Sequence, residues 1–178
     1  AEHDWFAEIE RRVNAHAALR GNVETEIARS DDIGAGCGCA YPDNVSEDIV
    51  RRSNLILCDL RGIASALPGA QHRLGALPMH LVAQVGDARV AIVHGDAWAL
   101  AGWRFAHDSL HSTEREPSLS AVFEQAALDG FASTHTCLPA LKVFDTPLGE
   151  RFVVNNGAAG MPNFSNTRYG LITRLGSI

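Results

Sequence analysis

Three short polar stretches of this sequence carry residue types that can bind a metal ion or a substrate. The first is Gly21–Asn22–Val23–Glu24, the second is His94–Gly95–Asp96, and the third, residues 133–137, contains His135 and Cys137. Two imidazoles and one side-chain amide oxygen suit Mn²⁺, Fe²⁺, Zn²⁺ or Ni²⁺ better than Ca²⁺, which prefers shells made of oxygen alone. Such ions lower the pKa of bound water toward neutrality and produce a hydroxide nucleophile. The residue types therefore indicate metal-assisted hydrolysis, provided that the three stretches converge.

Each of these residues also has an ordinary structural explanation when it is taken alone. Asn22 follows a glycine at the expected end of a helix, where both residue types are common. His94 and His135 can each be a hydrogen-bonded histidine at a strand end, and single motifs of this kind are weak. Asp96 can cap a helix that follows it. Cys137 belongs to a residue type that is most often small, apolar and buried.

The elements that must position these stretches are a mixture of helices and strands. Helical spacing predicts helices over residues 4–19, from Ser46 to Pro68–Gly69, over 98–110, and from Ser118 or Ser120 to Gly130, with a short turn over 26–29. Alternating or β-branched runs predict strands over 79–85, 88–93, 131–132, 141–144, 151–154 and 169–174, with hairpins at 86–87 and 145–149. The predicted class is mixed α/β, with the late strands antiparallel.

The polar stretches form a series of four motifs, each placed after an apolar element. They are Gly21–Glu24, Val93–Asp96, Thr134–Cys137 and Asn155–Ala158. In this order they resemble the later motifs of the calcineurin-like metallophosphoesterases, whose usual forms are G-N-H-D/E, an apolar strand ending in a ligand histidine, G-H-T-H and N-P-G-S. The resemblance extends over nearly the whole chain. It implies a four-layer αββα sandwich with a dinuclear metal site between two mixed sheets.

The resemblance also implies a set of metal ligands and an activity. Asn22, His94 and His135 would bind one of two divalent transition metal ions (Mn, Fe, Zn or Ni), and Cys137 stands at the position of a histidine that binds the other. The implied reaction is hydrolysis of a phosphomonoester or phosphodiester by metal-activated water. The expected partner is a small phosphorylated substrate or a nucleotide.

Other positions are assigned or questioned by the same resemblance. Asp96 and Asn156 are expected to line the substrate site. Val23 replaces a histidine that protonates the leaving group in many members of the family. Nothing before Gly21 matches the D-x-H and G-D motifs with which the family begins. We therefore expect the chain, residues 1–178, to be the larger C-terminal part of a single phosphoesterase-like domain whose N-terminal βαβ part is missing.

Composition excludes some classes of function. The chain has 178 residues and a formal net charge of −6, which argues against an extended nucleic-acid surface. No apolar run approaches the roughly 20 residues needed to span a bilayer, and the first residues do not resemble a signal peptide. Four cysteines in a chain of this length do not indicate a disulfide framework, and Cys37-Gly38-Cys39 is too closely spaced for a C-x-x-C motif. These features predict a cytoplasmic protein and leave its oligomeric state open.

Two other readings of the sequence remain open beside the metal-dependent phosphoesterase. The first is a degenerate, non-catalytic phosphoesterase fold that serves as a binding or scaffold module, which Val23 and Cys137 favour. The second is a cysteine hydrolase that uses Cys137, although Leu138–Pro139 does not place this thiol at a helix N-terminus that would lower its pKa. Metal stoichiometry distinguishes the first reading from the enzyme, and reactivity toward iodoacetamide tests the second.

Overall fold

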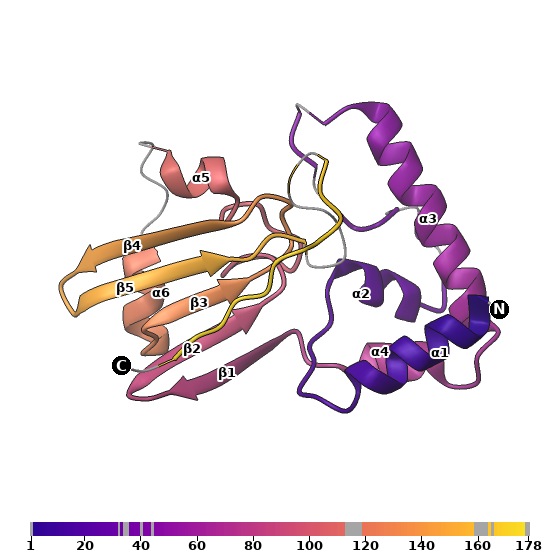
Figure 1. The fold of residues 1–178 in the computed structure, drawn as a ribbon, viewed down its shortest axis with the longest axis horizontal. Coiled ribbons are helices and arrows are strands. Elements are labelled where there is room, and N and C mark those ends of the chain that lie inside the picture. Colours follow the sequence, from indigo (N-terminus) through magenta and orange to yellow (C-terminus); the bar gives the residue numbers. More distant parts are fainter. Residues whose placement is uncertain are drawn as a thin grey trace. The chain divides into compact units, whose positions relative to one another are not determined.

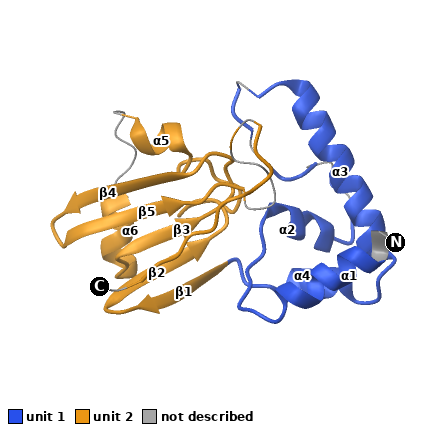
Figure 2. Cartoon of the chain, viewed as in Figure 1, with its two compact units in different colours: residues 1–79 blue, residues 80–178 orange. Residues whose placement is uncertain are grey.

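The computed structural model describes residues 2–31, 33, 36–39, 41–43, 45–112, 119–158, 164 and 166–176. The chain divides into two compact units, residues 1–79 and residues 80–178, which Figure 2 shows in different colours. Each unit has its own cluster of buried apolar side chains. The single domain expected over residues 1–178 stays a prediction. In the part of the chain described, no helix is long and apolar enough to cross a lipid bilayer.

The regular elements described in the first unit are helices. They are α1 (Glu2–Val13), α2 (Asn22–Ala28), α3 (Glu47–Ser65) and α4 (Ala70–Ala76) (Figure 1). Helix α3 follows Ser46 and ends shortly before Pro68–Gly69, which confirms the prediction from its apolar spacing and its acidic first turn. Helix α4 is not predicted from the sequence. It begins directly after Gly69, whose φ of +74° allows the chain to change direction there.

Helix α1 differs from its prediction in length and in the side chains that it buries. It ends at Val13 instead of residue 19, because a tight turn follows in which the His16 amide donates to the Val13 carbonyl. This helix is predicted from the helical spacing of four apolar residues, all of which have exposed side chains: Trp5, Ile9, Val13 and Ala17. Phe6 packs against the core of the unit instead. The spacing thus predicts the helix but not which of its faces is buried. The core residues of this unit are Ile27, Cys37, Leu57, Ala64 and Ala70.

Helix α2 begins at Asn22, where the sequence predicts a loop. The Glu24 carboxylate accepts a hydrogen bond from the Gly21 amide at 2.8 Å, and the Thr25 hydroxyl donates to the Gly21 carbonyl at 2.7 Å. The first contact satisfies an amide that the start of a helix leaves open, and the second adds to the bond that the Thr25 amide donates to the same carbonyl. The helix therefore starts before the turn predicted over 26–29, and Asn22 lies in its first turn.

The second unit contains a five-stranded sheet with the order β1-β2-β3-β5-β4 (Figure 1). Strands β1 and β2 form the predicted antiparallel hairpin, in which Val85 pairs with Ala88 and Gly86 has a φ of +59°. Strands β4 and β5 form the second predicted hairpin. The strands are β1 (His80–Val85), β2 (Ala88–Val93), β3 (Gly130–Ser133), β4 (Ala140–Thr146) and β5 (Gly149–Asn155).

The centre of this sheet is parallel. Strand β3 runs parallel to β2 on one side and to β5 on the other, so the carboxyl ends of these three strands lie at one edge of the sheet. The mixed α/β class is thereby confirmed. The four-layer sandwich is not confirmed, because the described residues form one sheet. Residues 169–174, predicted to be a strand, have no regular secondary structure.

Aromatic side chains form much of the core of the second unit. The Phe131 ring on β3 lies 5.2 Å from that of Phe105 and 5.4 Å from that of Phe123, between ring centroids. Phe123 belongs to helix α6 (Leu119–Ala126), which packs on the sheet through this contact. The prediction of a helix over 98–110 is wrong for most of its length. Among the described residues, the only helix in this segment is α5 (His107–His111).

Candidate functional site

Two of the predicted metal ligands meet at the carboxyl edge of the parallel strands. His94 directly follows β2, and one residue separates His135 from the end of β3. His94 Nε2 and His135 Nδ1 lie 3.0 Å apart, and the ring centroids are separated by 4.8 Å with an angle of 62° between the planes. Polar side chains that follow parallel strands converge at this edge in other open α/β sheets, where ligands bind.

Backbone hydrogen bonds hold the residues that carry these rings. The His94 carbonyl accepts hydrogen bonds from the amides of Thr134 at 3.2 Å and His135 at 2.9 Å. The Thr134 hydroxyl donates to the Gly157 carbonyl at 2.8 Å, which ties the loop after β3 to the loop after β5. The two imidazoles are therefore supported by main-chain contacts that do not depend on their own protonation.

Burial keeps both imidazoles neutral. It lowers the pKa of His94 to about 4, and burial together with the neighbouring His94 lowers the pKa of His135 to about 4, although Asp96 acts in the opposite direction. The Trp103 ring meets the His135 ring edge to face, with centroids 5.4 Å apart. His135 Nε2 is buried and has no hydrogen-bond partner among the residues described. The site thus presents neutral imidazole nitrogens, the form in which histidine binds metal ions.

Asp96 lies at this edge, but its carboxylate is engaged by the backbone of the following loop. Oδ1 accepts hydrogen bonds from the amides of Trp98 at 2.8 Å and Ala99 at 2.9 Å, and Oδ2 accepts one from the Arg104 amide at 3.1 Å. These bonds hold residues 97–104 in an irregular loop and explain why no long helix forms here. The predicted contact of Asp96 with a substrate stays a prediction.

Two asparagines lie at the same edge: Asn155 is the last residue of β5, and Asn156 follows it. The Asn156 side chain donates to the Leu171 carbonyl at 3.0 Å, and its expected contact with a substrate also stays a prediction. Asn155, which the sequence reasoning did not single out, is 1% exposed. Its amide group donates to the Phe105 carbonyl and to the Thr136 hydroxyl, and accepts from the Gly157 amide. A polar residue ending an apolar strand was the available signal for this role.

The other two predicted ligands are placed differently. Cys137 is exposed, and its sulfur is not part of a disulfide bond. Within the described ranges, no three His, Cys, Asp or Glu side chains gather closely enough to hold a metal ion. Asn22 belongs to the first unit, where its side-chain nitrogen donates to the Cys37 carbonyl at 2.6 Å and to Cys39 Sγ at 3.1 Å. The structure therefore brings His94 and His135 together, and metal binding by Asn22 and Cys137 stays a prediction.

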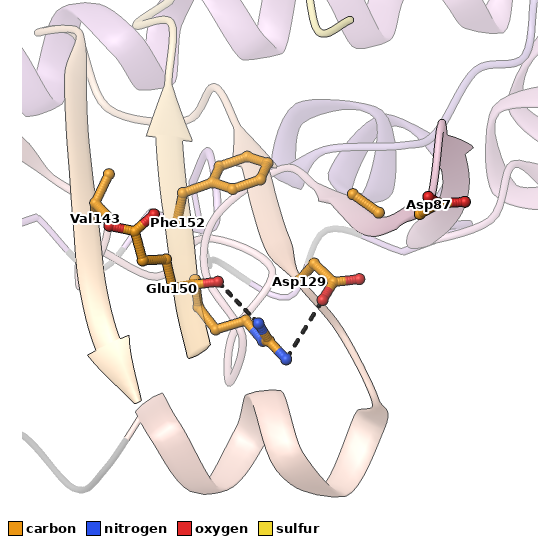
Figure 3. Close-up of a pocket in the computed structure, with 7 residues that line it drawn as sticks. Asp87, Asp129, Val143, Glu150 and Phe152 are labelled. Carbon is orange, nitrogen blue, oxygen red and sulfur yellow. Dashed lines mark hydrogen bonds and ion pairs between the residues drawn. The ribbon is translucent and has the colours of Figure 1, made fainter. Parts of the chain in front are cut away.

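The opposite ends of the same strands line a hollow of about 430 Å³ (Figure 3). Arg151 Nη2 lies 3.4 Å from Asp129 Oδ1, and the Arg89 amide donates to Asp129 Oδ2 at 2.8 Å. Because the charges of Asp129 and Arg151 already pair with each other, the hollow presents fewer unpaired polar groups to a ligand than the edge of the sheet that carries His94 and His135. Its lining residues are Asp87, Ala88, Asp129, Val143, Glu150, Arg151 and Phe152.

Comparison with known proteins gives only low similarities. No protein-family model and no curated protein sequence matches the chain. Hypothetical protein PH1004 from Pyrococcus horikoshii OT3 aligns with a TM-score of 0.47 and 19% identity over 81% of this chain and 52% of PH1004. The chain thus spans about half the length of that protein. Vacuolar Protein Sorting 29 from Cryptosporidium parvum aligns with a TM-score of 0.30 and 16% identity over 79% of this chain and 72% of the other.

Proposed function

We propose that this chain carries ligands for a divalent transition metal ion and acts in metal-dependent hydrolysis of phosphate esters, with His94 and His135 as ligands. The observation that carries the proposal is the 3.0 Å separation of His94 Nε2 and His135 Nδ1. Two nitrogens bound about 2.1 Å from one ion at a right angle lie about 3.0 Å apart. The two imidazoles are therefore already spaced as neighbouring ligands of one ion.

The protonation state of the pair also fits a metal. A metal ligand must offer a lone pair, and burial holds the pKa of both histidines near 4, so both rings are neutral at neutral pH. In the metal-free pair, the N–H of one ring donates a hydrogen bond to the nitrogen of the other. With an ion held by these two nitrogens, each ring would carry its proton on the nitrogen that faces away from the ion. For His135 that nitrogen is Nε2, which has no hydrogen-bond acceptor in the described part of the chain, so the free energy of metal binding must exceed the cost of a buried N–H without an acceptor.

The pair supports one ion better than two. A two-ion centre needs groups that bridge the ions about 3.5–4 Å apart. The Asp96 carboxylate lies at the same edge of the sheet as His94 and His135, and it already accepts three backbone hydrogen bonds. Binding of two ions (Mn, Fe, Zn or Ni), as expected from the sequence, therefore stays a prediction, because it requires further carboxylates to bridge the ions. A bound ion would supply a water of lowered pKa and positive charge for a phosphate ester, while His94 and His135 hold it.

Metal titration with matched variants tests this proposal. We expect Zn²⁺, Ni²⁺ and Mn²⁺ to bind the chain, and His94→Ala and His135→Ala each to weaken binding at least roughly tenfold, since each removes one ligand. The control is the double variant His107→Ala/His111→Ala. This removes an exposed pair on α5 whose ring centroids are also 4.8 Å apart. Binding that is lost in the control and kept in the site variants would contradict the proposal.

Hydrolysis is measured on the same proteins with p-nitrophenyl phosphate and bis(p-nitrophenyl) phosphate. We expect activity that requires added metal and disappears in His94→Ala and His135→Ala without loss of helical circular dichroism. Retained activity in both variants would exclude the site.

A second function, a non-catalytic phosphoesterase-like binding module, is favoured by one observation. No third His, Cys, Asp or Glu donor joins the pair in the described ranges. This function predicts that the ion binds at His94 and His135, while neither ester is hydrolysed at saturating metal. Metal-dependent turnover above the buffer rate would exclude it.

A further inference from the structure

The first unit contains a pair of thiols that the proposed hydrolysis does not use. Cys37 and Cys39 are both free, and they flank Gly38, whose φ of +70° lies in the left-handed region. A side chain at Gly38 would place its Cβ 3.2 Å from Glu26 Oε1. Both this close approach and the positive φ favour glycine at this position. Cys39 Sγ lies 4.0 Å from the Cys37 carbonyl oxygen. Cys37 is buried in the core of the unit, and Cys39 is half-buried.

Polar side chains hold both sulfurs in place. The Asn22 amide donates to the Cys37 carbonyl at 2.6 Å and to Cys39 Sγ at 3.1 Å, so one side chain contacts both cysteines. The Cys37 thiol donates to the Tyr41 hydroxyl at 3.3 Å, and this hydroxyl donates to Ser53 Oγ at 2.8 Å. Asn22 is itself 5% exposed. The buried amide and hydroxyl contacts restrict how far the two sulfurs can move apart.

Two thiols separated by one residue and contacted by the same Asn22 side chain suit either a soft metal ion or a disulfide bond. Structural zinc sites use four protein ligands, most often cysteine and histidine. The described part of the chain gathers no group of three or more His, Cys, Asp or Glu side chains, so the thiol pair lacks further donors of these types. A disulfide needs only the two sulfurs. The contacts therefore favour disulfide chemistry over a metal site.

We propose that Cys37 and Cys39 form a dithiol–disulfide exchange site that reacts with small-molecule disulfides. One cysteine thiolate attacks a sulfur of the small disulfide, which releases one small thiolate and leaves a mixed disulfide on the protein. The second cysteine loses its proton to water and attacks the protein sulfur of that mixed disulfide. The Cys37–Cys39 bond forms and the second small thiolate leaves. Two electrons pass from the cysteines to the small disulfide, and each cysteine gives up one proton.

The spacing predicts that this disulfide is reversible. A bond across a single intervening residue closes a small ring, and strained disulfides have more oxidising potentials than structural ones. Reduced glutathione should therefore reopen it. The site belongs to the first unit and needs no metal, so it is independent of the function proposed for His94 and His135.

The test uses the full chain with the exposed cysteines removed as Cys58→Ser/Cys137→Ser. The reduced, folded protein is incubated with oxidised glutathione in the presence of a chelator and analysed by intact mass and peptide mapping. We expect loss of two hydrogens, no retained glutathione, and release of two equivalents of reduced glutathione per chain. Adding Cys39→Ser to this background should prevent closure. Circular dichroism confirms that each variant is folded.

Three results would overturn the proposal. The first is a stable glutathione adduct on Cys37 or Cys39 with no bond between them. The second is no reaction in the folded protein while both thiols react after denaturation. The third is a disulfide that excess reduced glutathione does not reopen.

The Asn22→Ala variant tests the orienting contact in the same background. We expect closure of the mixed disulfide to slow roughly tenfold, because the side chain that contacts both cysteines is gone. An unchanged closure rate would contradict this role of Asn22. Because a chelator is present, neither result depends on metal binding.

Discussion

The backbone amide of His135 donates to the backbone carbonyl of His94 at 2.9 Å, so the two histidines are joined through their main chains as well as through their rings. The main-chain contact involves groups that do not titrate. Protonation of the rings is therefore expected to break the ring contact while the ends of β2 and β3 stay together. The site can change its charge without losing the backbone that supports it.

Acid should destabilise the second unit between about pH 6.5 and pH 4. Burial lowers the pKa of His94 and His135 from 6.5 to about 4. Between these values the unfolded chain binds more protons than the folded chain, so the free energy of unfolding falls as the pH falls and is fully retained above about 6.5. Each histidine would contribute up to about 3 kcal/mol by pH 4, and solvent screening at these partly exposed side chains should reduce the total loss for the pair to about 2–4 kcal/mol. Urea unfolding, followed by tryptophan fluorescence at a series of pH values, measures it.

The matched variants for this pH series are His94→Gln/His135→Gln and His72→Gln. The double variant should lose most of the pH dependence in this range, because glutamine does not titrate. His72 is exposed on α4 in the first unit, and its replacement should leave the pH dependence unchanged. A double variant with the wild-type dependence would show that other groups cause it.

Metal affinity should change little between about pH 7 and pH 5.5. Protons compete with metal for a histidine only near and below its pKa, which burial holds near 4 for His94 and His135. A histidine with the ordinary pKa of 6.5 would instead lose about tenfold over this range. Calorimetric titration of Zn²⁺ into the His107→Ala/His111→Ala background measures the pair by itself. A tenfold or larger loss at about pH 5.5 would contradict neutral, buried imidazoles.

Replacing Asp96 with alanine should unfold the loop after β2. The carboxylate is 6% exposed and accepts backbone hydrogen bonds from Trp98, Ala99 and Arg104. Leaving these amides without an acceptor should cost about 2–4 kcal/mol of stability. Hydrogen exchange at the three amides should accelerate well before global unfolding. Asp145→Ala, at an exposed position of β4, is the control and should change stability by less than about 0.5 kcal/mol.

Two glycine-to-alanine substitutions should have opposite effects on stability. A Cβ at Gly102 would lie 1.9 Å from Asp96 Oδ2, so Gly102→Ala should displace the carboxylate and destabilise the protein by roughly 2 kcal/mol or more. A Cβ at Gly62, within α3, would meet nothing within 4 Å. Gly62→Ala should stabilise the protein by about 0.5–1 kcal/mol, because alanine favours a helix. Thermal unfolding of both variants tests the pair, and equal shifts would contradict it.

Local patterns in the sequence predict the two hairpins and helix α3 because few neighbouring residues determine them. Gly86 sets the first turn, and Ser46 with Pro68–Gly69 marks the limits of the long helix. Residues 98–106 are mispredicted because a nearby polar side chain, and not their apolar spacing, decides their conformation. Their amides bond to the carboxylate of Asp96, and a pattern of apolar residues contains no information about that acceptor.

For the candidate site too, local patterns predict where each histidine lies but not that the two histidines meet. The apolar run of β2 places His94 at a strand end, and a similar argument places His135 after β3. The parallel pairing that brings the two together joins residues about forty positions apart, and no local pattern reports it. Asn155 shows the converse case. Its position as a polar residue at a strand end is visible in the sequence, but its partners, Phe105 and Thr136, come from distant loops and follow only from the fold.

The strand order of the sheet also has a consequence for how the second unit assembles. The β1–β2 and β4–β5 hairpins each close a loop of two residues, between the paired residues Val85 and Ala88 and between Thr146 and Gly149. Hairpins with such short loops form within about 1–10 μs, whereas long loops cost more entropy to close. Strand β3 has four residues and must join two preformed hairpins. We therefore expect the docking of β3 to be a late step of folding, at which the histidine pair forms.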